Sequence, residues 1–268
     1  MAQYYLGVDI GGTNIKAVML NGRGTVSRCF VIATSTRKAR FFKNLRLFVQ
    51  KITSDKKITG IGVGVPGIVD ARRGVLVKAP NLPFLNGWRV KYFFQRFTHR
   101  VLVDNDSRCF LRAEVEAGAA RGERNVVGIT IGTGIGGGIL IDGKMYRGSR
   151  GGAGEFGHMM IRVRSQKRIK DKNYEWEELA AKKAFLEHGD RSEMIGIGVA
   201  NLINAFDPDM VVLGGGGVMG GGVRLEEVRR IARTYTLSPL GKKIPIVKGK
   251  LGDRAQAIGA ALLCKRFR

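Results

Sequence analysis

The sequence predicts an α/β protein built from two lobes. Short apolar runs typical of strands alternate with amphipathic helical patterns along the chain, and a hairpin with a glycine-rich turn occurs once in each half. A chain of 268 residues is long enough for two domains of ordinary size. We place the lobes at residues 1–107, completed by a C-terminal helix over 253–268, and at residues 108–252. No low-complexity linker separates them, so we expect a crossing helix at the boundary and a ligand cleft between the lobes.

The first half predicts a three-strand meander followed by a helix and two further strands. The helix, over 40–53, places Phe41, Leu45, Phe48 and Ile52 on one face. The later strands, 58–65 and 101–103, end at Pro66-Gly67 and at Asp104-Asn105-Asp106. Open α/β sheets bind ligands at such strand ends. The meander strands are expected over 4–8, 15–20 and 25–33.

The second half repeats this order. A strand over 126–131 leads into a glycine-rich turn, and residues 138–141 return as its partner, which mirrors the first hairpin. A buried strand over 210–213 runs into four glycines at 214–217. Helices are expected near 174–187, 192–205, 225–235 and 253–264.

The chain is strongly basic, with 46 Lys and Arg against 22 Asp and Glu and a formal charge of +24. Such a charge favours an anionic partner, but it also suits solvated faces in a cell whose proteins are generally basic. Nucleic acid, polyphosphate and acidic membrane surfaces are the partners that composition alone leaves open.

Cysteine usage and the N-terminus indicate a soluble cytoplasmic protein. Cys29, Cys109 and Cys264 lie far apart and are odd in number, which argues against a disulfide framework. The N-terminus lacks the pattern of a secretory signal, and no run reaches the roughly 18–20 apolar residues of a membrane span. We therefore expect no membrane partner.

The two glycine-rich turns are candidate phosphate cradles, because backbone N–H groups approach phosphate oxygens where no Cβ obstructs them. Asp9, ahead of the first turn, suits Mg²⁺ held through its water shell. The glycine turn after residue 213 could lie against a base and ribose. The alternative is that these glycines serve turn geometry alone. The candidate cofactor-binding residues are Asp9, Gly11, Gly12, Thr13, Asn14, Lys16, Gly132, Thr133, Gly134, Gly214, Gly215 and Gly216.

Seven ordered segments carry a resemblance to a known family. DIGGTNIK, GVGVPGIVD, APNLP, VDNDS, TIGTGIGGGI, GEFGH and VVLGGGG occur in the order found in the ROK family of sugar kinases, over about residues 5 to 263. The resemblance implies the actin-like ATPase (ribonuclease H-like) fold with the active site between its lobes. The family also contains repressors with an extra N-terminal DNA-binding domain. This chain starts on the first strand, so we expect that domain to be absent.

The resemblance implies roles for particular residues. Asp106 falls at the position of the general base, although it also suits the N-cap of a helix starting at Ser107. Contacts to the sugar are implied for Gly67, Asn81, Asn105, Asp106, Glu155 and His158, of which Asn81 also makes a good turn residue.

The chain departs from the family where many members continue from the His into CxCGxxGCxE, a structural zinc loop. Here no cysteine follows His158 before residue 264, so zinc is not expected. Glu177 lies 19 residues after His158, the spacing of the zinc-bearing members, and is assigned to sugar contact, with Glu178 as the alternative register. The replacement stretch 162–172 carries a net +5 over eleven residues, which suits either a solvated loop or a polyanion track.

Together these features predict an ATP- and Mg²⁺-dependent kinase acting on the 6-hydroxyl of glucose, a related hexose or an N-acetylhexosamine. A polyphosphate-dependent glucokinase is one alternative, and a non-catalytic sugar-sensing or nucleic-acid-binding regulator is another. No specific nucleic acid is expected despite the charge. The sequence leaves the sugar, the donor and a possible homodimer open.

Overall fold

The computed structural model describes residues 3–161, 175–181 and 190–265. The chain divides into two compact units. Unit 1 consists of residues 1–113, 148–152 and 254–268, and unit 2 consists of residues 114–147 and 153–253. The division falls inside helix α3 (Asp106–Ala117), and each unit has its own sheet and its own apolar core.

The sheet of unit 1 has the strand order β3-β2-β1-β4-β7. The first three strands pair antiparallel, whereas β1, β4 and β7 run parallel. The carboxyl ends of these three strands therefore meet at one edge of the sheet, where polar loops follow them. The bounds are β1 (Tyr4–Ile10), β2 (Asn14–Asn21), β3 (Val26–Ala33), β4 (Ile58–Val65) and β7 (Val101–Asn105).

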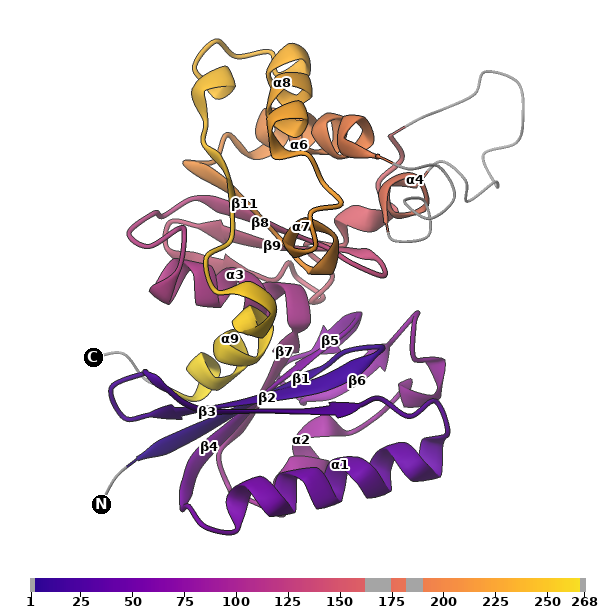
Figure 1. The fold of residues 1–268 in the computed structure, drawn as a ribbon, viewed down its shortest axis with the longest axis vertical. Helices are drawn as coiled ribbons and strands as arrows, with labels where there is room; N and C mark the ends of the chain where they lie inside the picture. Colours follow the sequence, from indigo (N-terminus) through magenta and orange to yellow (C-terminus); the bar gives the residue numbers. More distant parts are fainter. Residues whose placement is uncertain (1–2, 162–174, 182–189, 266–268) are drawn as a thin grey trace. The chain divides into compact units, whose positions relative to one another are not determined.

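Helices cover both faces of this sheet (Figure 1). Helix α1 (Lys38–Thr53) buries Phe41, Leu45, Val49 and Ile52 on one face. Helix α9 (Ala255–Cys264) lies on the other face, so close that a Cβ at Gly62 of β4 would stand 1.6 Å from the carbonyl oxygen of Ala260. The unit also contains β5 (Ile68–Asp70), β6 (Val75–Lys78), η1 (Pro83–Leu85) and α2 (Val90–Phe94).

Unit 2 repeats this topology with the order β10-β9-β8-β11-β12, in which β8, β11 and β12 are parallel. Helix α6 packs on α8 through Gly196, where a Cβ would lie 2.6 Å from Ile231. The strands are β8 (Val126–Ile131), β9 (Ile135–Ile141), β10 (Lys144–Tyr146), β11 (Met210–Gly214) and β12 (Ile246–Lys248). The helices are η2 (Phe156–His158), α4 (Trp176–Ala180), α6 (Ser192–Phe206), α7 (Gly216–Met219), α8 (Leu225–Tyr235), η4 (Gly241–Lys243) and η5 (Gly252–Arg254).

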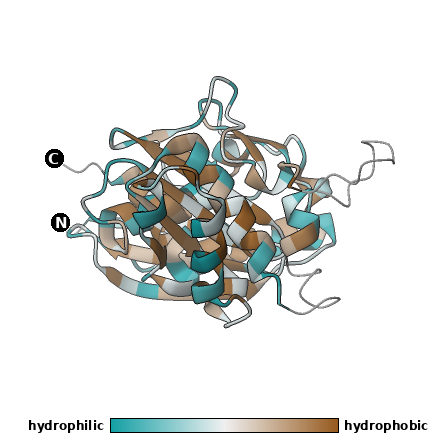
Figure 2. Cartoon of the chain, turned by 90° about the horizontal axis from the view of Figure 1, so that it is seen from above, coloured by the Kyte–Doolittle hydropathy of each residue, from teal (hydrophilic) through white to brown (hydrophobic). Residues whose placement is uncertain are grey.

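Hydrophobic residues concentrate in the strands, while the helices alternate between hydrophilic and hydrophobic stretches, as Figure 2 shows. This pattern follows from burial, since a parallel strand covered on both faces is apolar along its length, whereas a covering helix buries only one side. Among the described helices, none has the length and apolar character needed to cross a membrane.

The structure confirms both predicted hairpins and most predicted helices, and it corrects two details. The helix expected near 174–187 covers only Trp176–Ala180 among the described residues, because Glu175 bridges to Met160 and the extended backbone of Ala181 ends the helix. In α1, Val49 is fully buried and Phe48 only packs at the edge of the core. The stretch 162–172 lies outside the described residues.

Candidate active site

Unit 1 holds one group of candidate site residues, beginning at the carboxyl end of β1. Asp9 is buried there and pairs with Lys16 across the hairpin and with Gly64 on β4. The turn between β1 and β2 is closed by a hydrogen bond from the Gly11 N–H to the Asn14 carbonyl. Thr13 and Asn14 are exposed, and Gly12 has open space where a Cβ would stand. The turn therefore offers accessible main chain beside a buried acid.

Asp106 lies close to Asp9 because of how β4 and β7 pair. Gly64, the neighbour of Asp9 on β4, is also the partner of Asp104 on β7, and a Cβ at Gly64 would lie 3.5 Å from the Cα of Asp106. Burial raises the pKa of the Asp9 carboxyl to about 8, and the charge of Asp106 adds to this rise, while Lys16 opposes it. Asp9 and Asp106 therefore lie near each other at one strand edge, where burial and mutual repulsion make their ionised forms unfavourable. A bound cation would offset this cost.

Asn105 holds the polar loop in place. Its amide nitrogen donates to the Gly67 carbonyl at 3.1 Å, and its side-chain oxygen accepts the backbone N–H groups of Ser107 and Arg108. Asn105 is therefore the capping side chain of α3, in contrast to the sequence-based alternative that gave this role to Asp106. Asp106 opens the helix, and one of its carboxylate oxygens also accepts the Ser107 N–H, at 2.8 Å.

Gly67 requires its glycine. Its φ is +91°, and a Cβ there would lie 2.2 Å from the carbonyl oxygen of Lys78 and 3.1 Å from Pro80. The segment that leads to Asn81 consequently packs on the same loop that Asn105 fastens. Asn81 itself is exposed in a turn. Unit 1 thus gathers Asp9, Gly67, Asn105 and Asp106 at one strand edge, with Asn81 on the adjoining turn.

A buried ion pair that the sequence analysis missed supports this loop. The Arg108 guanidinium binds the Asp104 carboxylate at 2.7 Å, and both side chains are almost fully buried. The same guanidinium donates to the carbonyl of Gly151 at 3.1 Å, which ties the 148–152 segment to unit 1. Asp104 lies on β7 and Arg108 on α3, so no helical spacing in the sequence signals this pair.

Unit 2 holds a second group of candidate residues, around the hairpin between β8 and β9. The Gly132 N–H donates to the Gly134 carbonyl, and Thr133 at the tip is exposed. One carboxylate oxygen of Glu177, on α4, accepts the Ile135 N–H at 2.9 Å. A Cβ at Gly134 would lie 2.2 Å from that same oxygen, so a side chain there would force the Glu177 carboxylate to move. The structure therefore brings Glu177 against the glycine-rich turn.

The GEFGH segment adjoins the same acid. Gly157 is packed so that a Cβ there would lie 3.2 Å from the Glu177 Cβ. His158 is paired with Glu175, whose carboxylate lies 2.8 Å from the ring Nδ1 and raises the pKa of the imidazole. Glu155 is half-buried on the same segment. Glu175 was not predicted, because its contact with His158 joins residues far apart in the sequence, which periodicity does not reveal.

The glycines after β11 stand beside the glycine-rich hairpin. Gly214 pairs with Thr130 on β8, and Gly215 has φ +88° with its Cα so near β8 that a Cβ would lie 2.4 Å from the Ile131 carbonyl. Gly216 begins the short helix α7 and has open space around it. The turns 132–134 and 214–216 therefore lie at the same strand edge of unit 2.

Metal ligands can be tested against the residues that are present. Asp9 fits an outer-shell role for Mg²⁺, because it is a buried carboxylate beside a second acid and Mg²⁺ keeps much of its water. Within residues 3–161, 175–181 and 190–265, no group of three or more His, Cys, Asp or Glu side chains is placed to hold a metal ion. The absence of a zinc site stays a prediction, since most of the loop concerned lies outside those ranges.

The fold and these strand-edge loops define a two-lobe protein of the actin-like ATPase class. The ROK family model matches residues 5–191 and 178–267, and the chain belongs to this family.

Named relatives include both enzymes and regulators. An N-acetyl-D-glucosamine kinase from Photobacterium profundum is 30% identical, with 97% of this chain and 98% of the relative covered. A xylose repressor from Caldicellulosiruptor bescii is 28% identical, with 95% and 76% covered. The crystal structure of a ROK family glucokinase from Streptomyces griseus in complex with glucose and AMPPNP superposes with a TM-score of 0.84 at 26% identity, covering 97% of this chain and 99% of that one.

Proposed function

We propose that the protein is an ATP-dependent hexose kinase that transfers the γ-phosphate to the 6-hydroxyl of glucose, a related hexose or an N-acetylhexosamine. The observation that carries the proposal is the grouping of Asp106, Asn105 and Asp9 at one strand edge of unit 1. The similarity to a glucokinase solved with glucose and an ATP analogue supports both the acceptor and the donor.

In this proposal Asp106 is the general base. Its carboxylate takes the proton from the attacking sugar hydroxyl as the oxygen bonds to the γ-phosphorus and the bond to the leaving ADP oxygen breaks. Asn105 and Gly67 fix the loop that carries Asp106, because their hydrogen bond leaves the start of α3 little freedom. The reaction needs this fixed geometry more than it needs a strong base.

In the glycine-rich turns, the main-chain donors proposed for the phosphates are those of Gly12, Thr13 and Asn14 in unit 1 and of Thr133 and Gly134 in unit 2. Gly11 and Gly132 shape the two turns, since their N–H groups already donate to Asn14 and Gly134. Asp9, helped by the charge of Lys16 across the hairpin, would hold Mg²⁺ through water, and the metal when bound neutralises phosphate charge. Gly214, Gly215 and Gly216 would lie against the nucleoside, where the lack of side chains permits a close approach.

The sugar contacts in unit 2 are assigned to Glu155, His158 and Glu177, and those in unit 1 to Asn81, Asn105 and the Gly67 loop. A sugar hydroxyl both donates and accepts, so carboxylates and an imidazole recognise it through paired hydrogen bonds. The raised pKa of His158 favours its protonated form, which donates. Glu177 connects the sugar contacts to the glycine-rich hairpin through Ile135.

A regulator without catalysis is the second candidate, because a xylose repressor is nearly as similar to this chain as a kinase is. Asp9, Asn105 and Asp106 argue against it, since a protein that only binds sugar has no need of a base and a metal ligand. Polyphosphate in place of ATP is a variant of the first candidate that changes only the donor.

A donor and acceptor panel tests the proposal. Purified protein is assayed with ATP–Mg²⁺ or long-chain polyphosphate against glucose, fructose, mannose, N-acetylglucosamine and N-acetylmannosamine, and the product phosphate position is determined. We expect a 6-phosphorylated product with ATP and at least one of these sugars. Activity with polyphosphate alone would change the donor. Sugar binding by calorimetry without phosphorylation from either donor would overturn the kinase and favour the regulator.

A further inference from the structure

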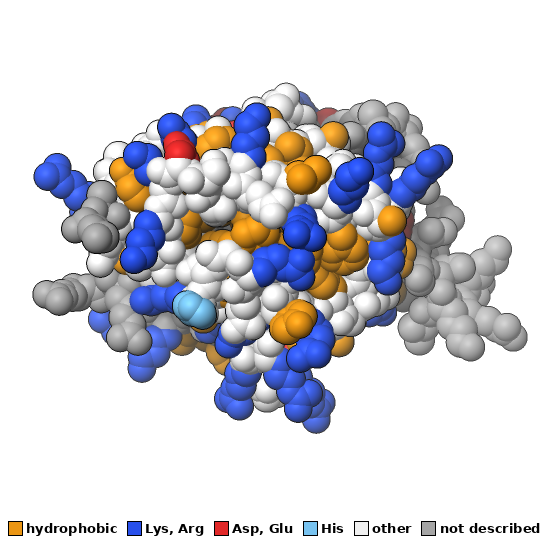
Figure 3. All heavy atoms as spheres, turned by 90° about the horizontal axis from the view of Figure 1, so that it is seen from below, with side chains coloured by type: hydrophobic (Ala, Val, Ile, Leu, Met, Phe, Trp, Pro, Cys, Tyr) orange, Lys and Arg blue, Asp and Glu red, His pale blue; other side chains and the backbone are white. Residues whose placement is uncertain are grey.

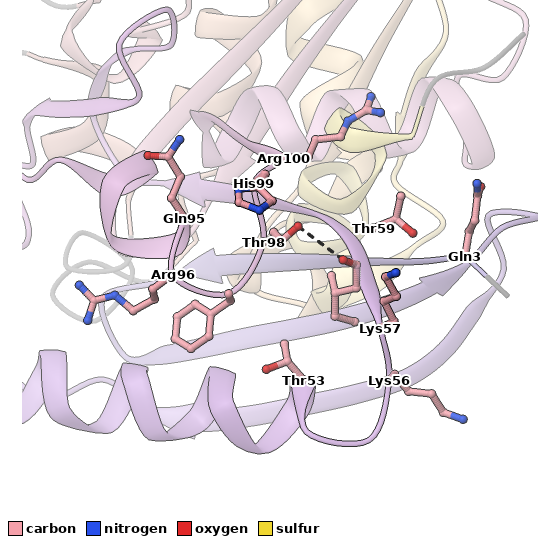
Figure 4. A pocket seen from close by; sticks show the side chains of 12 residues that line it. Gln3, Thr53, Lys56, Lys57, Thr59, Gln95, Arg96, Thr98, His99 and Arg100 are labelled. Atoms are coloured by element: carbon pink, nitrogen blue, oxygen red, sulfur yellow. Dashed lines mark hydrogen bonds between the residues drawn. The ribbon is translucent and has the colours of Figure 1, made fainter. Parts of the chain in front are cut away.

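A basic hollow lies in unit 1, away from the candidate active site. It has a volume of about 990 Å³ and is lined by the end of α1, the loop before β4 and the segment that leads into β7. Figure 4 shows these residues, among them Lys56, Lys57, Arg96, His99 and Arg100. We call this set the basic hollow.

The basic hollow is rich in Lys and Arg and poor in acids. Within the described residues, none of its Lys or Arg side chains is in an ion pair. The only acid in segments 53–59 and 95–100 is Asp55, whose carboxylate is bound by Arg28 at 2.7 Å. On the face drawn in Figure 3, Lys and Arg side chains are widely spread and acidic ones are scarce. Asp55 also interacts with the charge of Lys56, but one acid does not offset several cations, so the hollow has a positive potential.

Two cations of the hollow contact aromatic rings that lie outside its lining. The Lys56 amine lies 5.6 Å from the centre of the Tyr4 ring, and the Arg96 guanidinium lies 4.7 Å from the Phe93 ring. These contacts hold the cations in place without removing their charge. The Thr98 hydroxyl donates to the carbonyl oxygen of Ile58 at 3.4 Å, and both residues line the hollow.

The cations point in different directions around the rim. In Figure 4 the heads of Arg96, Lys56 and Arg100 diverge from one another, whereas Lys57 and His99 stand nearer the middle. A single compact anion could not reach all of them. An extended anion with several charged groups could contact them in turn, and arginine and lysine together suit phosphate oxygens.

The basic hollow is distinct from the site proposed for the kinase reaction. Ile58 begins β4 and Arg100 immediately precedes β7, so the hollow lies at the amino ends of both strands. Asn105 and Asp106 lie at the carboxyl ends. Because β4 has eight residues at about 3.3 Å each, the two places are roughly 25 Å apart along the strand.

We propose that the basic hollow is a second anion site, which binds an inorganic chain of phosphoryl groups. The site accepts such a chain along its rim through Lys56, Lys57, Arg96 and Arg100. Binding of phosphate chains in the basic hollow does not require phosphoryl transfer at Asp106, so this proposal goes beyond the kinase function.

Binding of tripolyphosphate, measured by isothermal titration calorimetry at low salt with Mg²⁺ and AMPPNP at saturating concentrations, tests the proposal. The test variant is Lys56→Gln, Lys57→Gln, Arg96→Gln. The matched control is Lys38→Gln, Arg40→Gln, Lys43→Gln, which removes the same charge from exposed positions of α1. Thermal unfolding of both variants verifies that each is folded.

We expect tripolyphosphate to bind at least about tenfold more weakly to the test variant, with the control within about threefold of the unmodified protein. Binding should weaken as salt is added and should exceed that of orthophosphate. Equal losses in both variants would show diffuse attraction and overturn the site, as would no binding at all. Orthophosphate binding as tightly, or a single-stranded oligonucleotide binding more tightly at the same residues, would also overturn it.

Discussion

The carboxylate of Glu177 accepts the backbone N–H of Ile135 at 2.9 Å. An acid on α4 thereby fastens the first residue of β9, immediately after the glycine-rich turn. Gly134 has no side chain to displace it, since a Cβ there would lie 2.2 Å from the acid. Glu177, which we assign to sugar contact, therefore also supports the turn 132–134, which we assign to phosphate binding.

Two substitutions of Glu177 should separate these roles. Glu177→Gln keeps an oxygen for the Ile135 N–H but loses the acceptor proposed for a sugar hydroxyl, whereas Glu177→Ala loses both. We expect only Glu177→Ala to lower the free energy of unfolding, by about 1 kcal/mol, while both weaken sugar binding by about tenfold. Denaturant unfolding and calorimetry with the sugar measure the two effects.

The exposed neighbour Glu178 provides the control for these variants. Glu178→Gln should leave both the unfolding free energy and the sugar affinity unchanged. If Glu178→Gln lost sugar affinity and Glu177→Gln did not, the assignment would move by one residue.

Asp9→Asn should make the metal-free protein more stable. The buried carboxyl has a pKa of about 8 because of burial and the charge of Asp106, so its ionised form is costly in the folded state. We expect a rise in Tm of about 2 °C or more without ligand. The rise in Tm that ATP–Mg²⁺ gives to the unmodified protein should largely disappear, because a ligand stabilises only in proportion to its binding. An unchanged response to ATP–Mg²⁺ would contradict the metal role of Asp9.

His158 should titrate above its ordinary pKa of 6.5, because Glu175 binds its ring nitrogen. NMR titration of the imidazole measures this directly. Glu175→Gln should lower the pKa of His158, whereas Glu178→Gln should not, since Glu178 is not among the groups that shift it. A His158 pKa that did not respond to Glu175→Gln would refute the pairing.

The sign of the pH effect follows from the raised pKa. The folded protein holds the His158 proton more tightly than the unfolded chain does, so the pair stabilises the fold fully below pH 6.5. This stabilisation is lost as the pH rises through the folded-state pKa. The difference in Tm between the unmodified protein and Glu175→Gln should therefore be larger at pH 5.5 than at pH 8.5.

Gly62→Ala should destabilise unit 1 strongly. The new methyl group would stand 1.6 Å from the Ala260 carbonyl, so α9 must move off the sheet. We expect a loss of about 2–3 kcal/mol in denaturant unfolding. Gly152→Ala is the control, because nothing lies within 4 Å of a Cβ there, and it should change the free energy by less than about 0.5 kcal/mol.

Much of the fold could be predicted because each element carries a local signal. The hairpin around DIGGTNIK is apolar on both sides of a polar turn, and the structure forms β1 and β2 there. The helix expected near 174–187 begins only at Trp176, because the bridge of Glu175 to Met160 is a contact between distant residues that no local pattern contains, and it is interrupted at the extended Ala181. The predicted residues 182–187 lie outside the described part of the chain.

The sequence names candidate site residues, which stay predictions, but it does not show the contacts that these residues make. Motif order indicated Asp106 and Asn105, and the structure adds that Asn105 caps α3 and holds Gly67. The pairs Asp104–Arg108 and His158–Glu175 were missed, since neither spacing distinguishes a structural contact from an exposed one. Burial and partner choice arise from tertiary packing, which a single sequence does not show.

The most direct test of the central claim, that Asp106 is the general base, is the turnover of Asp106→Asn beside its sugar affinity. Asparagine preserves the size of the side chain and its capacity to accept the Ser107 N–H, but it cannot take a proton. We predict that kcat falls by at least about 100-fold while sugar binding by calorimetry stays within about threefold. A variant that turns over at nearly the normal rate would contradict the account.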